Sequence, residues 1–191
     1  MYSGFANLES TLEYFKRKKI DQSFYNKTKN YYISSIGLGT YAPESYKDEN
    51  YEYSFKDIIK DGLKGGINII DTAINYRCQV SEKEIGEALK ELIESKEIKR
   101  EEVVLASKGG FIPLEYPFPK NPYEWINDNI IKTNLSPESK IAIDQHTISP
   151  KYLRWSLETS LKNLGVETLD IFYIHNPEMQ SGYVSKDELL K

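Results

Sequence analysis

Residues 68–76 read Asn-Ile-Ile-Asp-Thr-Ala-Ile-Asn-Tyr, and this stretch decides the fold. Its start, Asn68 to Ile70, predicts a short buried strand that runs directly into a polar turn. The turn leaves a carboxylate, Asp71, and a phenol, Tyr76, at the C-terminal end of that strand. A carboxylate is seldom buried without a partner, so packing alone does not explain Asp71. Parallel α/β folds place their chemistry at such strand ends, and we therefore expect a functional site here.

Three more apolar runs predict strands around this one, at residues 36–41, 103–107 and 169–174. The stretches between the strands carry apolar residues at the spacing of amphipathic helices. The helix boundaries are marked by Ser54 and Gly65-Gly66, by a capping box of Ser81 and Glu84, and by Ser149-Pro150 and Gly165. Alternating strands and helices imply an α/β protein with a parallel sheet.

Such a sheet either stays open and doubly wound or closes into a barrel. Four predicted strands, with a last helix that begins at a capping box of Ser185 and Glu188, resemble the first half of a (β/α)8 TIM barrel. A complete barrel takes about 250 residues, and a bare half would expose long strand edges. We therefore expect either a truncated barrel or one whose open edge is covered by a second copy in a homo-oligomer or by a partner chain.

In this interpretation the chain has two parts, an N-terminal extension at residues 1–30 and a partial barrel at residues 31–191. The extension is polar and includes a predicted helix at residues 10–19. Residues 31–36 are predicted to form a strand or hairpin arm that leads into the first strand of the sheet.

A long insertion at residues 111–149 interrupts the βα repeat after the third strand. Prolines alternate with aromatic residues in its first half. Two interpretations stay open, a lid over the site or a surface excursion with a small aromatic core of its own. His146, near the end of the insertion, has no motif around it and is expected to be solvated.

The composition is that of an ordinary globular protein, with 39% hydrophobic and 28% charged residues. A net charge of −4 argues against nucleic-acid binding. The single cysteine, Cys78, excludes an internal disulfide framework and fits a reducing compartment. No apolar run approaches the ~18 residues that a membrane span needs, and no signal peptide is evident at the start. We expect a cytoplasmic protein that does not interact with membranes.

Two later strands also end on residues suited to chemistry, Lys108 and His175. Parallel strands point the same way, so these side chains should converge with Asp71 and Tyr76 on one face. A phenol has a pKa near ~10, and a nearby ammonium favours the phenolate, while a carboxylate keeps the ammonium charged and oriented. A histidine beside the phenol can hold a carbonyl oxygen. The set suits protonation of a carbonyl oxygen while hydride arrives at carbon, and the hydride requires a nicotinamide cofactor.

Four motifs strengthen this interpretation by resemblance. They are Asp71-Thr72-Ala73-Ile74-Asn75-Tyr76, Ser81-Glu82 with Ile85-Gly86, Ala106-Ser107-Lys108, and Leu169-Asp170-Ile171-Phe172-Tyr173-Ile174-His175. Together, in this order, they resemble the motifs of the aldo/keto reductase superfamily over roughly residues 31–178. The resemblance implies a (β/α)8 barrel, NADP(H) as cofactor, and reduction of aldehydes or ketones, small-molecule carbonyl substrates, to alcohols.

Carried over motif by motif, the resemblance makes Tyr76 the proton donor, tuned by Lys108 and Asp71, and gives His175 the task of orienting the substrate carbonyl. Cofactor contacts are implied for Gly39 and Thr40, after the first strand, and for Asp71. No metal site is expected.

The sequence departs from the usual family pattern in three respects. His175 is followed by Asn176-Pro177-Glu178, where many relatives have an aromatic residue and a proline. The tyrosine continues as Tyr76-Arg77-Cys78-Gln79-Val80, where the commoner continuation is Tyr-Gly, and this variant predicts a changed rim of the pocket. The family's second half, which grips the adenine and the 2′-phosphate, has no counterpart in these residues. A catalytically silent fragment or regulatory subunit that needs a partner is therefore the alternative function. An isomerase or aldolase on the same fold is disfavoured, because Lys108 comes together with Tyr76 and His175.

Overall fold

The structure is a computed structural model that describes residues 1–42, 54–143, 145–183, 185 and 187. Its centre is a four-stranded parallel sheet in the order β3-β4-β5-β6. The strands are β3 (Leu38–Gly39), β4 (Ile69–Asp71), β5 (Val104–Gly109) and β6 (Ile171–Ile174). The predicted parallel sheet and α/β class are confirmed, and the sheet forms part of a barrel wall. The predicted capping residue Glu188 lies outside the described residues.

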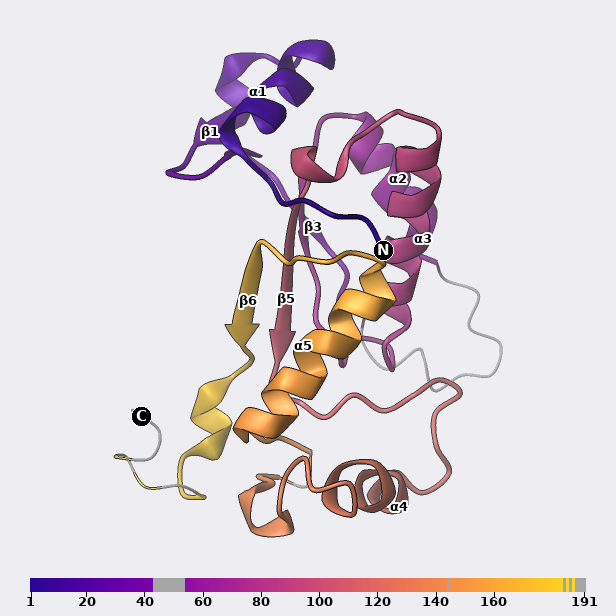
Figure 1. Cartoon of the computed structure of the whole chain (residues 1–191), viewed down its shortest axis with the longest axis vertical. Coiled ribbons are helices and arrows are strands. Elements are labelled where there is room, and N and C mark those ends of the chain that lie inside the picture. Colours follow the sequence, from indigo (N-terminus) through magenta and orange to yellow (C-terminus); the bar gives the residue numbers. More distant parts are fainter. Residues whose placement is uncertain (43–53, 144, 184, 186, 188–191) are drawn as a thin grey trace.

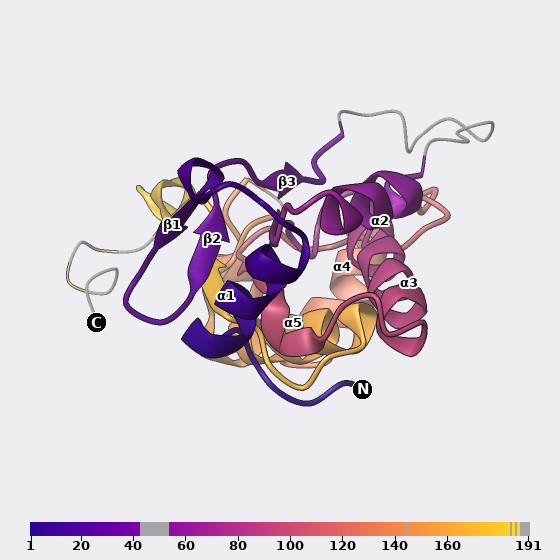
Figure 2. The ribbon, with the colours of Figure 1, turned by 90° about the horizontal axis from the view of Figure 1, so that it is seen from above.

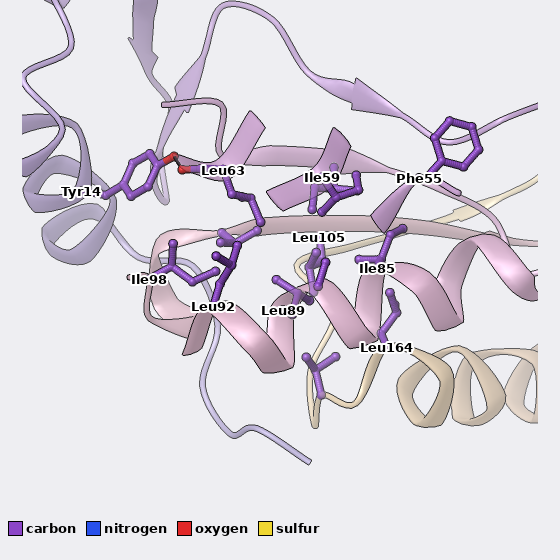
Figure 3. Close-up of a cluster of buried hydrophobic side chains, with 14 of the residues drawn as sticks. Tyr14, Phe55, Ile59, Leu63, Ile85, Leu89, Leu92, Ile98, Leu105 and Leu164 are labelled. Atoms are coloured by element: carbon purple, nitrogen blue, oxygen red, sulfur yellow. Dashed lines mark hydrogen bonds between the residues drawn. The ribbon is translucent and has the colours of Figure 1, made fainter. Parts of the chain in front are cut away.

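Three helices connect the strands, and they pack side by side against one face of the sheet (Figure 1). They are α2 (Lys56–Lys64), α3 (Val80–Glu94) and α5 (Pro150–Leu164). The main hydrophobic core fills the space between these helices and the sheet, and Figure 3 shows how its apolar side chains interdigitate. Side chains of α2 and α3, such as Leu63 and Leu89, meet Leu105 of β5 there, because amphipathic spacing turns the apolar stripe of each helix toward the sheet.

The register of the sheet decides which side chains face away from the helices. In β5, Leu105 points into the helix core, so Lys108, three positions later, points to the opposite face. Asp71 of β4 pairs with Ala106 of β5. Residues paired in a parallel register share a face, and Ala106 is two positions from Lys108. The carboxylate of Asp71 and the ammonium of Lys108 are therefore brought to the same face.

The N-terminal segment lies across the N-terminal ends of the strands (Figures 1 and 2). It consists of α1 (Leu8–Arg17), η1 (Gln22–Phe24) and an antiparallel hairpin of β1 (Tyr25–Lys27) and β2 (Tyr32–Ser34). The predicted helix and hairpin arm are thus confirmed. The hydroxyl of Tyr14 donates to the carbonyl oxygen of Leu63 at 2.5 Å, which ties α1 to the end of α2.

The insertion at residues 111–149 lies beyond the C-terminal ends of the strands, where Figure 1 shows α4. It contains α4 (Pro122–Ile126), η4 (Asn127–Ile131) and η5 (Glu138–Lys140), while η3 (Arg100–Glu102) and η6 (Pro177–Gln180) lie elsewhere. A second core joins Ile112, Ile126 and Ile130 of the insertion to Tyr152 of α5. Trp125 of the insertion packs against this core, whereas Tyr116 and Tyr123 are 47% and 57% exposed, so the core of the insertion is mainly aliphatic with a single tryptophan.

The predicted capping box of Ser81 and Glu84 is also wrong. Helix α3 begins at Val80, and the side chains of both residues are used in tertiary contacts. Ser81 Oγ donates to the carbonyl oxygen of Thr40 at 3.0 Å, while Glu84 accepts from the backbone N–H of Phe55 at 2.9 Å. Both side chains therefore tie α3 to neighbouring segments.

None of the helices in the part of the chain that the structure describes is both long enough and apolar enough to span a membrane.

Candidate active site

The ammonium of Lys108 is the centre of the site. Its Nζ donates to Asp71 Oδ2 at 2.8 Å, to the carbonyl oxygen of Thr72 at 2.8 Å, and to the hydroxyl of Tyr76 at 3.3 Å. The side chain of Lys108 is 15% exposed and that of Asp71 is 51% exposed. The lysine is thus held by one fixed carboxylate and one fixed carbonyl, and its third N–H points at the phenol.

The phenol ring of Tyr76 is held between other rings and the ammonium. Its centroid lies 5.2 Å from that of Tyr41 and 5.8 Å from that of His175, edge to face in both pairs. The Nζ of Lys108 lies 5.0 Å from the same centroid. These contacts fix the plane of the ring, so the direction of the hydroxyl is set by neighbours from three segments of the chain.

The turn after Tyr76 has an unusual backbone. Arg77, Cys78 and Gln79 all have positive φ, at 51°, 53° and 72°. A non-glycine residue in this region costs about 1–2 kcal/mol, so three in succession require compensation. The buried guanidinium of Arg77 forms an ion pair with Glu84 at 2.5 Å, and Gln79 Oε1 accepts from Asn163 at 3.2 Å. Arg77 also lines the cavity described below, which agrees with the predicted change at the rim.

His175 follows β6, and its backbone N–H donates to the carbonyl oxygen of Gly109 at 2.8 Å. Burial lowers the pKa of His175 to about 4, helped by the charge of Lys108 and by His146, and opposed by Asp71 and Glu178. The imidazole is therefore neutral near neutral pH. Its Nδ1 is buried and has no hydrogen-bond partner among the described residues.

A cavity of about 460 Å³ opens beside these groups at the C-terminal ends of the strands. Tyr76 and His175 both line it. The other lining residues are Tyr41, Ala42, Asn75, Arg77, Phe111, Gln145 and Asn176. The cavity gives a small carbonyl compound room beside the phenol and the imidazole. No group of three or more His, Cys, Asp or Glu side chains in the described parts of the chain is placed to hold a metal ion.

The structure places the two other expected cofactor contacts at the end of the neighbouring strand. A side chain at Gly39 would meet nothing within 4 Å, so the backbone there is accessible. Thr40 is fully buried, and its hydroxyl donates to the hydroxyl of Thr72 at 2.8 Å. Thr40 thus supports the loop that carries Thr72, whose carbonyl oxygen binds Lys108.

Sequence reasoning missed the contribution of the insertion to this site. Phe111 and Gln145 line the cavity, and His146 is fully buried, which corrects the expectation that it is solvated. Phe111 comes three residues after Lys108, a position that could have indicated a wall of the site. The position of His146 carries no comparable signal, since its partners are distant in the sequence.

Comparisons with known proteins show which family the sequence resembles. The sequence model of the Aldo/keto reductase family matches residues 35–185. The NADH-specific methylglyoxal reductase of Escherichia coli is 31% identical over 147 residues, which are 75% of this chain and 38% of that protein. Aldose reductase B of Dictyostelium discoideum is 41% identical over 147 residues, 77% of this chain and 33% of that protein.

A solved structure supports the fold. The crystal structure of an aldo-keto reductase complexed with NADPH matches with a TM-score of 0.50 and 22% sequence identity, covering 80% of this chain and 36% of the other. The present chain therefore covers about a third of the length of these relatives.

Proposed function

The chain belongs to the aldo/keto reductase family, and we propose that it carries the proton-donating site of an oxidoreductase that reduces aldehydes or ketones to alcohols. One observation supports this proposal above the others. The Nζ of Lys108 binds Asp71 and reaches the hydroxyl of Tyr76 at 3.3 Å, at the edge of a cavity that Tyr76 itself lines. In this arrangement the phenol can donate its proton to a ligand in the cavity, and the ammonium can stabilise the phenolate that is left.

In the proposed reaction, the hydroxyl of Tyr76 donates its proton to the carbonyl oxygen of the substrate. The O–H electron pair stays on the phenolate, and the positive charge of Lys108 stabilises it. Asp71 and the carbonyl oxygen of Thr72, each 2.8 Å from Nζ, keep the ammonium charged and pointed at the phenol. The charge that develops on Tyr76 therefore meets a fixed counter-charge, which lowers the cost of the proton transfer.

His175 positions the carbonyl group in this proposal. Because its pKa is lowered to about 4, the ring is neutral and carries one N–H donor at neutral pH. A neutral donor can hold a carbonyl oxygen without competing with Tyr76 as an acid. The edge-to-face contact between the two rings, at 5.8 Å, places the imidazole and the phenol on the same cavity.

A nicotinamide cofactor, NADP(H) or NAD(H), would supply the hydride. The donor set fits its nicotinamide end, because Asp71 is half exposed beside Lys108 and can accept from a ribose hydroxyl. Among the described residues that line the cavity, Arg77 is the one cation, and Glu84 is already paired with it. These residues do not form a phosphate site, so the rest of the cofactor requires other groups.

The test is the Tyr76→Phe variant, compared with Tyr123→Phe in the exposed part of the insertion. We expect Tyr76→Phe to lower turnover of a generic aldehyde by about 10²–10⁴-fold, because the proton donor is lost. Binding of NADPH or NADH, followed by cofactor fluorescence, should be unchanged in both variants. Full activity in Tyr76→Phe would overturn the proposal.

A second function is favoured by the exposed edge of the sheet. Tyr173 and Ile174 of the edge strand β6 are 50% and 42% exposed, and β6 pairs on one side with β5. An exposed apolar edge strand favours association with another chain. The alternative is a silent or regulatory subunit that needs a partner to complete the barrel. Molar mass in solution, measured together with activity, separates the two, since an active monomer contradicts the alternative.

A further inference from the structure

His146, in the last part of the insertion, makes a specific contact with the segment that carries His175. The ring of His146 is fully buried, and its Nε2 lies 2.7 Å from the backbone carbonyl oxygen of His175. On its other side, the side-chain amide nitrogen of Gln180 lies 2.8 Å from Nδ1 of His146 and 2.9 Å from the carbonyl oxygen of His146. One residue of the insertion therefore contacts both ends of the segment 175–180.

These contacts determine where the proton of the His146 ring lies. The amide group of Gln180 has two N–H donors, and the same nitrogen faces both a ring nitrogen and a backbone oxygen. An amide oxygen in that place would face the backbone oxygen of His146, which excludes the flipped amide. Nδ1 thus accepts a hydrogen bond, and the proton of the neutral ring is on Nε2. Nε2–H donates to the carbonyl oxygen of His175.

The surrounding residues pack closely around the contact between His146 and His175. A Cβ on Gly110 would lie 2.6 Å from the carbonyl oxygen of His175 and 2.8 Å from Nε2 of His146, so the position requires glycine. The ring of Phe111 contacts both imidazoles edge to face, with its centroid 4.9 Å from that of His146 and 5.1 Å from that of His175. The burial of His146 also lowers its pKa, which keeps the ring neutral.

We propose that His146 is a positioning residue for His175, which it holds through its Nε2–H and the His175 carbonyl so that the catalytic imidazole stays against the ring of Tyr76 at the cavity. The inference rests on the proposed role of His175 in carbonyl reduction. It gives the insertion at residues 111–149 a task at the site, since the insertion supplies both the hydrogen bond and the aromatic ring that fix the imidazole.

The test uses the fact that the chain has two histidines, so imidazole NMR signals can be assigned without ambiguity. His146→Leu removes the donor, and His146→Gln keeps one, because the amide nitrogen of glutamine is as many bonds from Cα as Nε2 of histidine. Both variants remove the titrating ring of His146 and leave Lys108, Asp71 and Glu178 around His175. The difference between the two variants therefore reports the loss of the donor to the His175 carbonyl and not the loss of the His146 charge.

We expect the titration midpoint of His175 to lie higher in His146→Leu than in His146→Gln by about one pKa unit or more, because a released ring regains water. In the protein or assembly that shows turnover, His146→Leu should lower kcat about 10-fold relative to His146→Gln, with little change in KM, because misplacement costs mainly the chemical step. A purely structural role would lower stability in both variants and leave the two His175 midpoints equal, which would overturn the proposal.

The unchanged protein provides a test that does not depend on the folding of any variant. The 15N chemical shifts of the imidazole, measured by NMR, must show that His146 is protonated on Nε2. That proton must exchange slowly with water. A ring protonated on Nδ1, or one that exchanges as fast as an exposed histidine, also overturns the proposal. These measurements need no turnover, so they distinguish failure of this inference from failure of the proposed reductase activity, which the Tyr76→Phe variant tests.

Discussion

The two ends of the sheet use similar polar residues for different purposes. At the N-terminal ends, Arg100 and Asp170 form an ion pair at 2.9 Å in which both side chains are 2% exposed. At the C-terminal ends, Lys108 and Asp71 form one at 2.8 Å, with side chains 15% and 51% exposed. The side chains of the first pair are buried, whereas those of the second are partly exposed beside Tyr76, which lines the cavity.

The surroundings of the two pairs make the difference clearer. Asp170 also accepts from the backbone N–H groups of Ala6 and Leu105, at 2.7 and 2.8 Å. At the other end, buried Nδ1 of His175 and Oδ1 of Asn75 have no hydrogen-bond partner among the described residues. Nε of Arg100 is also buried without a partner among the described residues, so the difference is that His175 and Asn75 line a cavity in which a ligand can reach them. Barrel enzymes divide their two faces in this way.

The strongest test of this comparison is Arg100→Met. We expect it to lower the free energy of unfolding by about 3–5 kcal/mol, because it leaves the buried carboxylate of Asp170 without its counter-charge. Urea denaturation followed by circular dichroism measures the change. The double variant Arg100→Met/Asp170→Leu should recover most of the loss, and a single-variant loss under about 1 kcal/mol would contradict the closed character of this end.

The matched change at the other end is Lys108→Met. Here kcat should fall by about 10²–10³-fold, since the charge that stabilises the phenolate of Tyr76 is removed. The free energy of unfolding should change by less than about 1 kcal/mol, because Asp71 is half exposed and water can replace the lysine. Steady-state kinetics and urea denaturation are measured on the same sample. A stability loss as large as that of Arg100→Met would remove the distinction between the two ends.

The neutral imidazole of His175 makes the stability of the protein depend on pH. Its pKa in the folded protein is about 4, below the ordinary 6.5, so between these values the unfolded chain binds the proton more readily. The contribution of His175 to the free energy of unfolding is therefore complete above pH 6.5 and is lost as the pH drops toward 4. Because the ring is partly exposed, we expect a loss of about 1–2 kcal/mol, less than the full pKa difference would give.

Urea denaturation at a series of pH values measures how the free energy of unfolding changes with pH. His175→Asn should make this pH dependence weaker, and the remaining part should come from the other groups whose pKa the fold lowers, among them His146, through burial, and Glu91, through its bonds to Lys56 and Lys60. If the free energy of unfolding of His175→Asn changed with pH as much as that of the unchanged protein, the fold would not hold the imidazole of His175 neutral.

The smallest expected effect comes from a pair of glycines at opposite ends. Gly165, with φ of 68°, has nothing within 4 Å of an added Cβ, so Gly165→Ala should cost about 1 kcal/mol and leave kinetics unchanged. Gly110→Ala, where the added Cβ meets the carbonyl of His175, should also change kcat and the His175 signals. If Gly165→Ala disturbed the site as much as Gly110→Ala, the two ends would not be independent.

Much of the candidate site could be predicted from local patterns. Asp71 and Lys108 end strands in a βα repeat, and the carboxyl ends of parallel strands meet at one edge of the sheet. Tyr76 follows in the turn, so its approach to Lys108 needs no information beyond the repeat. The proximity of these residues follows from the order of the elements.

His146 could not be placed in this way. Its ring partner Gln180 lies 34 residues further along the chain, and the carbonyl of His175 lies 29 residues further. No periodicity links these positions, so a polar surrounding sequence predicted solvent where the fold provides a buried network. The failed capping box of Ser81 and Glu84 has the same cause, because Thr40 and Phe55 compete for the two side chains.

The sequence by itself determined the alternation of strands and helices and the polar groups at the strand ends, because hydrophobic periodicity and turn residues act over a few positions. The tertiary structure decided what surrounds those groups. It encloses Arg100 and Asp170, leaves Asp71 beside a cavity, and brings His146 against His175. These outcomes depend on contacts between distant segments, which set burial and hydrogen bonding, and burial and hydrogen bonding set the charge state of each group.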